Sequence, residues 1–223
     1  MAKRGSYAKG AAKKEEILDT ALRVIAENGY SKATLKDVAD AVGLSQMGVL
    51  HHFGTKEELF TQVLAQRDRL SLGGQPLTEN PLAEDLDEES LQRIIGETGE
   101  PIAAMIQGVA RRNAETPGLI QLFTMLLAEG TEDTHKAHDY FQNRIARLHA
   151  MLKLSIERMQ ADGSLPESID SSRLATLHIG LMDGLQTLSL YDDSVSVEEH
   201  LAFFWGLLGV GPSSLRNSGD LEK

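Results

Sequence analysis

The chain has 223 residues and carries 22 lysines and arginines against 33 aspartates and glutamates, a net charge of −11. Glycine and proline occur at ordinary levels and there is no cysteine. These counts exclude collagen-like and disulfide-stapled classes, together with cysteine nucleophiles and thiolate metal sites. The longest apolar run, residues 201–211, is too short to cross a bilayer, and the basic start lacks the apolar stretch of a signal peptide. We therefore expect a globular, cytoplasmic protein.

Charge is divided unevenly along the chain. Residues 1–70 have a net charge of +2, whereas residues 71–223 have a net charge of −13. Five basic residues and no acid occur in the first fourteen positions: Lys3, Arg4, Lys9, Lys13 and Lys14. This asymmetry favours either an N-terminal surface that binds a polyanion or a basic tail that has no partner.

Two helices are predicted in the first part of the chain. Apolar residues recur at helical spacing over residues 17–25, and Gly29 ends that helix. Thr34 followed by Asp37 has the spacing of a capping box, which predicts the start of a helix over residues 34–42.

Two further helix starts follow closely. Ser45 is placed to cap a helix over residues 45–53, because Leu44 and Val49 have the spacing of a hydrophobic staple. Thr55 and Glu58 then form a second candidate capping box, which opens a helix over residues 55–69.

The remainder of the chain also has helical spacing. Pro101 and Pro117 each stand at a favourable first helical position, and longer helices are predicted over residues 132–161, 171–191 and 197–210. Alternating strand patterns do not compete anywhere. The predicted fold class is all-α, with about nine helices.

The helices over residues 34–42 and 45–53, joined by a turn that contains Gly43, match a helix-turn-helix, in which the second helix enters the DNA major groove. The predicted outward residues of that second helix are short or polar, namely Ser45, Gln46, Met47, Gly48, His51 and His52. Gln46 has the amide that pairs with an adenine edge, and Met47 can contact a thymine methyl group.

Phosphate contacts are expected from helix N-termini, from their capping residues and from nearby basic side chains. The candidates are Thr34, Lys36, Ser45, His51, Thr55 and Lys56.

Residues 29–60, GYSKATLKDVADAVGLSQMGVLHHFGTKEELF, resemble the DNA-binding domain of the TetR family of bacterial transcription regulators. The resemblance lies in the T-x-x-D-V-A second helix, the turn that follows it and the H-F-x-x-K-E-x-L entry into the fourth helix. It departs at Met47, Gly48 and Leu50, where the family often has Gly, Thr and Tyr. The resemblance implies a ligand-responsive regulator, most often a repressor, that binds a palindromic operator as a homodimer and is released by a small-molecule effector.

With that resemblance, the chain divides into five expected parts. They are a basic disordered arm (1–12), a three-helix helix-turn-helix DNA-binding domain (13–70), an acidic loop or linker (71–89), a helical effector-binding and dimerisation domain (90–212) and a tail (213–223).

The last two helices are the expected dimer interface, because leucines line one face beside glycines that permit close helix approach. The candidates are Leu177, Gly180, Leu181, Gly184, Leu185, Leu188, Leu201, Phe204, Trp205 and Leu208. The alternative is that both stripes are buried inside one subunit.

The effector pocket is expected among soft or polar residues that interrupt apolar faces. The candidates are Met105, Phe123, His149, Met151, His178, Met182, Asp183 and Gln186, each of which could equally be ordinary core or surface.

The sequence also contains a pair of histidines with metal-ligand spacing. His135 and His138 beside Glu132 have the spacing of metal ligands, but a clear further ligand is missing, so no metal and no cofactor are expected. Catalytic motifs such as G-x-S-x-G, H-E-x-x-H and a complete P-loop do not occur, so an enzyme is not predicted. The alternative function is an all-α ligand-binding protein or enzyme that reuses the fold without binding DNA.

Overall fold

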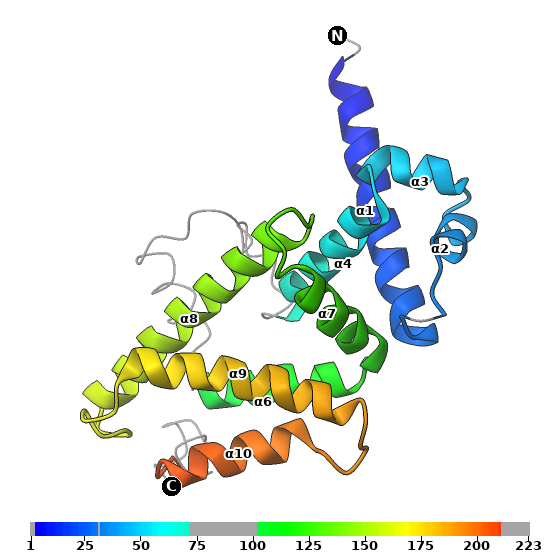
Figure 1. Ribbon diagram of the computed structural model, residues 1–223. Coiled ribbons are helices and arrows are strands. Elements are labelled where there is room, and N and C mark those ends of the chain that lie inside the picture. The colour runs from blue at the N-terminus through cyan, green and yellow to red at the C-terminus, as the bar shows by residue number, and fades with distance from the viewer. Residues whose placement is uncertain (1–2, 31, 72–101, 211–223) are drawn as a thin grey trace, which may run out of the picture. The chain divides into compact units, whose positions relative to one another are not determined.

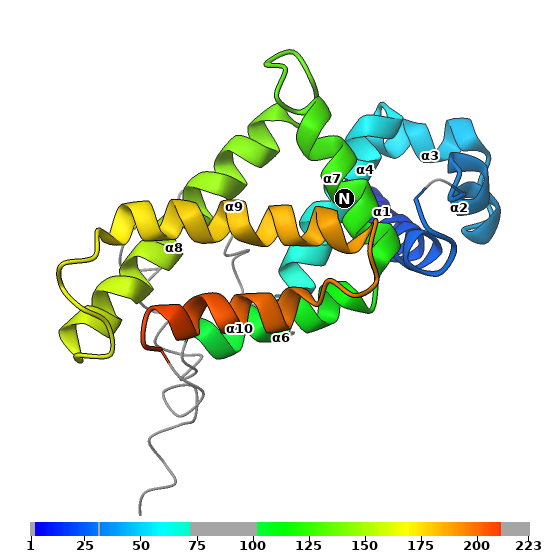
Figure 2. The same ribbon diagram turned by 60° about the horizontal axis from the view of Figure 1, so that its bottom comes forward.

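The computed structural model describes the backbone of residues 3–30, 32–71 and 102–210, and side chains over residues 9–30, 32–68 and 108–210. Regular structure within these ranges is entirely helical (Figures 1 and 2), so the all-α prediction is confirmed. In chain order the helices are α1 (Lys3–Asn28), α2 (Leu35–Ala41), α3 (Gln46–Phe53), α4 (Lys56–Ser71), α6 (Ile102–Ala114), α7 (Pro117–Glu129), α8 (His138–Ala161), α9 (Ser171–Ser189) and α10 (Val197–Leu207). The tail and all of the acidic linker except Ser71 lie outside the described residues. No helix in the described ranges is long and apolar enough to cross a membrane.

The N-terminus differs from the expected disordered arm. Helix α1 begins at Lys3 and its first turns extend past α3 (Figure 1). Alanine and lysine are good helix formers and fill much of residues 8–14, which explains why the helix continues into this segment.

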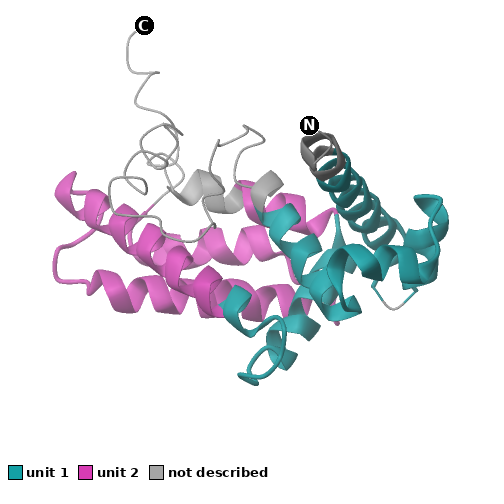
Figure 3. Cartoon of the chain, turned by 90° about the horizontal axis from the view of Figure 1, so that it is seen from above, with its two compact units in different colours: residues 1–75, 116–141 teal, residues 76–115, 142–223 magenta. Residues whose placement is uncertain are grey.

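Packing divides the chain into two compact units (Figure 3). Unit 1 consists of residues 1–75 and 116–141, and unit 2 of residues 76–115 and 142–223. The N-terminal unit is thus larger than the expected domain, because α7 and the first residues of α8 pack with it.

The core of unit 1 joins α1 to the three helices that follow it. Ile17 and Ile25 of α1 are buried with Val49 of α3 and Leu59 of α4. Gly118 lets α7 approach α1 closely, since a Cβ there would lie 2.3 Å from the carbonyl oxygen of Ile25.

A buried polar cluster lies at the α4 end of unit 1. The Arg67 guanidinium donates to the Asp68 carboxylate (2.8 Å) and lies over the Phe123 ring, 5.1 Å from its centroid. The Tyr140 hydroxyl donates to the other Asp68 oxygen (2.7 Å). This cluster ties the end of α4 to α7 and to the start of α8.

Unit 2 has a core of its own around Trp205, Leu201 and Ile156. Figures 1 and 2 both show α6 and α9 lying beside α10. An Arg111–Glu198 ion pair (2.8 Å) also joins α6 to the first turn of α10.

Candidate nucleic-acid interface

Helix α2 begins with a complete capping box, as predicted. The Thr34 hydroxyl and backbone N–H both donate to the Asp37 carboxylate (2.6 and 2.8 Å), and the Asp37 N–H donates back to Thr34 Oγ1 (3.2 Å). These bonds, that from the Thr34 hydroxyl above all, hold the pKa of Asp37 below its ordinary value. The Thr34 hydroxyl is therefore already engaged within the helix end.

The turn between α2 and α3 is fixed by backbone conformation and by a second cap. Gly43 has a φ of +67°, which a glycine adopts without strain, and the Leu44 N–H donates to the Ala39 carbonyl (2.9 Å). Ser45 Oγ accepts from the Gly48 N–H (3.0 Å), which caps α3 as predicted.

Helix α3 buries one face and presents the other to solvent. Val49 and Phe53 are buried, whereas Gln46 and His51 are exposed, and the Met47 side chain is 75% exposed. Of the other predicted contact residues, Ser45 is exposed, and Gly48 and His52 are half-buried. The exposed face of α3 is therefore polar except for one methionine, and it is accessible to a binding partner.

Exposed lysines also occur on the two helices that neighbour α3 in the chain. Lys36 is exposed on α2, and Lys56 is exposed in the first turn of α4, with its Nζ 5.2 Å from the centroid of the Phe60 ring. Thr55 caps α4 by accepting from the Glu58 N–H (3.1 Å). Both of these helices, α2 and α4, contact α3, and each carries an exposed basic group.

Two basic residues of α1 make contacts that the sequence analysis did not anticipate. Lys13 Nζ donates to the backbone carbonyl of Val42 (2.9 Å) and to Glu16 (3.0 Å). Lys14 Nζ lies 5.2 Å from the centroid of the Phe53 ring. Apolar periodicity gives no signal for the contacts with Val42 and Phe53, because each joins a lysine of α1 to a distant part of the chain.

The candidate dimer residues divide into exposed and buried groups in unit 2. On α9, Leu177, Gly180, Gly184 and Leu188 are exposed and Leu181 is half-buried. Within the same subunit, Leu185, Leu201 and Trp205 are buried, and Phe204 and Leu208 are half-buried. Helix α10 instead exposes Phe203 (67%) and Leu207 (69%), which the sequence analysis missed because residues 201–207 are apolar on both faces of this helix.

The candidate effector residues do not form one described site. Phe123 lies in the core of unit 1, whereas the His149 ring in unit 2 bonds to the Ser172 carbonyl (3.0 Å). The others in unit 2 are buried (Met151, His178, Gln186) or half-buried (Met182, Asp183), and the Met105 side chain lies outside the described residues.

His178 has the most distinctive environment among these candidates. Its ring packs 5.6 Å from that of Trp205, and burial lowers the pKa of His178 to about 4. His178 Nδ1 and Trp205 Nε1 are buried without a hydrogen-bond partner. Buried polar atoms normally have partners, so these two are available to a further polar group.

The two candidate metal histidines have partners in the backbone. His135 Nδ1 accepts from the Ala137 N–H (3.2 Å), and the His138 ring bonds to the Gly130 carbonyl (3.0 Å). No group of three or more metal-binding side chains occurs among the described residues.

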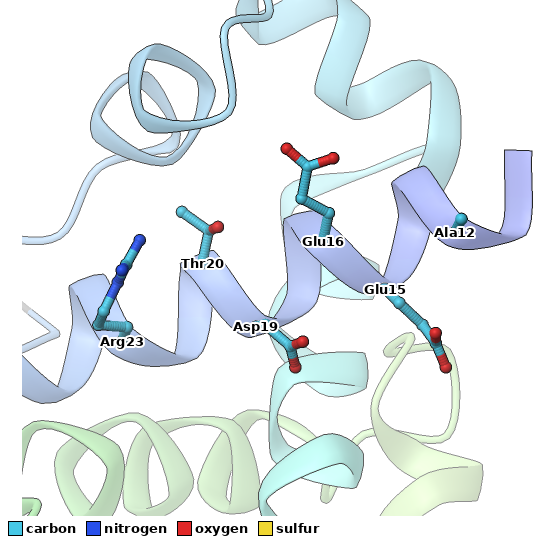
Figure 4. Close-up of a pocket in the computed structure, with 6 residues that line it drawn as sticks. All are labelled: Ala12, Glu15, Glu16, Asp19, Thr20 and Arg23. Atoms are coloured by element: carbon cyan, nitrogen blue, oxygen red, sulfur yellow. The ribbon is translucent and has the colours of Figure 1, made fainter. Parts of the chain in front are cut away.

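An open depression of about 570 Å³ lies along α1 (Figure 4). Its lining residues are Ala12, Glu15, Glu16, Asp19, Thr20 and Arg23. A small-molecule site usually encloses its ligand with mainly apolar side chains, whereas this depression is lined by one helix with three carboxylates. It includes none of the candidate effector residues.

Comparison with known proteins places these features among bacterial regulators. Residues 17–63 match the family described as bacterial regulatory proteins, tetR family. The repressor AcnR of Corynebacterium efficiens is 41% identical over 71 residues, which cover 32% of this chain and only 37% of AcnR. The regulator SrpR of Pseudomonas putida is 27% identical over 209 residues, covering 91% of this chain and 88% of SrpR.

Solved structures share the fold. A structure from Rhodococcus sp. RHA1 has a TM-score of 0.61 at 16% identity and covers 92% of this chain and 100% of its own. Salmonella enterica GusR has a TM-score of 0.53 at 22% identity and covers 89% of this chain and 96% of its own.

Proposed function

Because this chain belongs to the TetR family of bacterial regulatory proteins, we propose that it is a transcriptional repressor that binds a palindromic operator as a homodimer and is released by a small-molecule effector. The observation that carries the proposal is the α2–α3 helix-turn-helix. Both of its helices are capped, and α3 leaves Gln46, Met47 and His51 exposed.

The exposed face of α3 supports direct reading of bases. Gln46 has an amide that can pair with N6 and N7 of adenine, and Met47 presents an apolar group to a thymine methyl. Gly48 has no side chain to hold the backbone away from the groove. No arginine or lysine occurs on α3, so a bidentate guanine contact from this helix is not proposed.

Phosphate contacts are assigned to residues around α3. Lys36, Ser45, His51 and Lys56 are the main candidates, because all four are exposed on α3, at its N-cap or on the two neighbouring helices. Thr34 and Thr55 already cap their own helices and His52 is half-buried, so these three residues are secondary candidates.

The DNA-binding proposal is tested by the salt dependence of affinity for genomic fragments. About six phosphate contacts per dimer predict a log–log slope of roughly −5. Gln46→Ala is expected to cost about 1–3 kcal/mol at one base position, whereas Lys56→Ala weakens all sequences alike. Absent or salt-insensitive binding would refute the proposal, and equal losses on every sequence from both variants would refute the assigned roles.

Dimerisation is proposed through the exposed apolar face of α9 and α10. Leu177 and Leu188 flank Gly180 and Gly184 on α9, and Phe203 and Leu207 are exposed apolar residues on α10, which packs against α9. The glycines permit close approach of a second pair of helices, as in a four-helix interface.

Sedimentation of two charge variants tests this interface. Leu207→Glu is expected to give monomers with an intact fold, because it places a charge in the proposed contact. Ala161→Glu, at an exposed position of α8, is the matched control and is expected to remain dimeric. A dimeric Leu207→Glu variant would show that another surface mediates association.

The effector site is proposed in unit 2 around His178, whose ring packs against Trp205, with Met182 packed against the same core. The unpartnered His178 Nδ1 and Trp205 Nε1 support this location, because a polar group of a ligand would satisfy them. Release of operator DNA by extracted metabolites tests it. His178→Phe is expected to abolish that release, while Met125→Ala, at an exposed position of α7, is expected to preserve it.

A further inference from the structure

We infer that Lys13 is a positioning residue for the helix-turn-helix and that it does not contact DNA phosphates. The inference rests on the proposed DNA-binding function. Lys13 belongs to the basic stretch for which charge leaves two interpretations open, a surface that faces a polyanion or a tail without a partner. Its ammonium instead donates to the Val42 carbonyl (2.9 Å) and to Glu16 (3.0 Å). Both acceptors lie within unit 1, so the Lys13 ammonium is bonded to the protein itself.

The carbonyl that Lys13 binds lies at the start of the turn between α2 and α3. Val42 is the C-cap of α2, and carbonyls at a helix C-terminus lack helical partners and carry partial negative charge. Gly43 follows with its φ of +67°, and Ser45 caps α3 only two residues later. A bond at Val42 therefore holds the turn that determines where α3 points.

Lys14 supports the same arrangement from the adjacent position of α1. Successive helical residues point about 100° apart, so neighbouring lysines can reach different elements. The Lys14 ammonium lies over the ring of buried Phe53, the last residue of α3. Lys13 thus holds the end of α2 while Lys14 contacts the end of α3.

If Lys13 positions the turn, its removal should lower the affinity for DNA without changing how that affinity depends on salt. A lysine that neutralises a phosphate releases counterions, and its removal lowers the salt slope by about 0.9 for each protomer. Lys13 is paired within the protein, so its removal should change affinity without changing the slope. Lys36, which is exposed on α2, provides the contrast.

The experiment measures binding of a fragment selected by the wild-type protein over a range of salt concentrations. Lys13→Met is expected to weaken binding roughly two- to fivefold at every salt concentration, with an unchanged slope. Lys36→Met removes the same charge and is expected to lower the slope by about 1.8 for the dimer. Lys13→Arg is expected to restore affinity, because a guanidinium can also donate to the Val42 carbonyl.

Hydrogen exchange supplies a readout that does not depend on DNA. The Gly43 and Leu44 amides donate to carbonyls of α2 (3.3 and 2.9 Å), so they should exchange faster in Lys13→Met and recover in Lys13→Arg. The inference would be overturned if the salt slope fell in Lys13→Met as it does in Lys36→Met. It would also be overturned if the Gly43 and Leu44 amides of Lys13→Met exchanged at the wild-type rate. Failure of the wild-type protein to bind any fragment would instead count against the proposed function, and the exchange measurement would still test the Val42 contact.

Discussion

Replacing Gly118 with alanine tests the close approach of α7 to α1. An added Cβ would lie 2.3 Å from the Ile25 carbonyl oxygen and 2.7 Å from the Gly29 Cα, both of them backbone atoms. Ordinary contact begins near 3.4 Å, so the helices must separate by about 1.1 Å, which is 3.4 minus 2.3. Overpacking of this kind costs about 1–3 kcal/mol, and the shift must break contacts along both helices.

Urea unfolding of Gly118→Ala measures that cost against a matched variant. Gly10→Ala is the control, because a Cβ at Gly10 meets nothing within 4 Å and should stabilise α1 by about 0.5–1 kcal/mol. Exchange at the Gly29 amide, which donates to the Ile25 carbonyl (2.9 Å), locates the disturbance. A Gly118→Ala protein as stable as the wild type, with normal protection at Gly29, would refute the packing argument.

Three other predictions follow from caps, burial and exposure. Thr34→Ala should cost about 1 kcal/mol in urea unfolding and should return the pKa of Asp37 toward its ordinary value in an NMR titration, because it removes the capping hydroxyl. Burial holds the pKa of His178 at about 4 in the folded state, against 6.5 in the unfolded state. The unfolded state therefore binds a proton first, and the free energy of unfolding should fall by about 3 kcal/mol as the pH falls from 6.5 to 4. His178→Phe should remove that dependence in acid titrations while His200→Phe, at an exposed position, retains it. Gly180→Ala should raise the free energy of unfolding of the subunit by up to about 1 kcal/mol, because alanine favours the helix and its Cβ meets nothing within 4 Å. The same change should weaken dimerisation in sedimentation equilibrium. A dimer as tight as that of the wild type would argue against a contact at this glycine.

The helix-turn-helix was largely predictable because its signals are local. The caps at Thr34 and Ser45 act within three residues of each helix start, and a glycine suited to positive φ stands between them at Gly43. The start of α1 was not predictable in this way, because basic composition alone does not distinguish a helix from a disordered arm.

The candidate sites in the rest of the chain were less predictable. From Leu201 to Leu207, α10 has only apolar residues and one glycine, so periodicity could not decide that Trp205 faces the core while Phe203 and Leu207 face solvent. Likewise the contacts of Lys13 and Lys14 depend on how separate helices pack, which sequence spacing does not encode.

Trp205 is the only tryptophan in the chain, and it lies in the core of unit 2 against His178 and Phe204. Its indole emission therefore originates from one place, without any label. Fluorescence should follow the melting of unit 2, whereas circular dichroism adds the helices of both units. Two melting curves that diverge would reveal that the halves of the molecule unfold in separate steps.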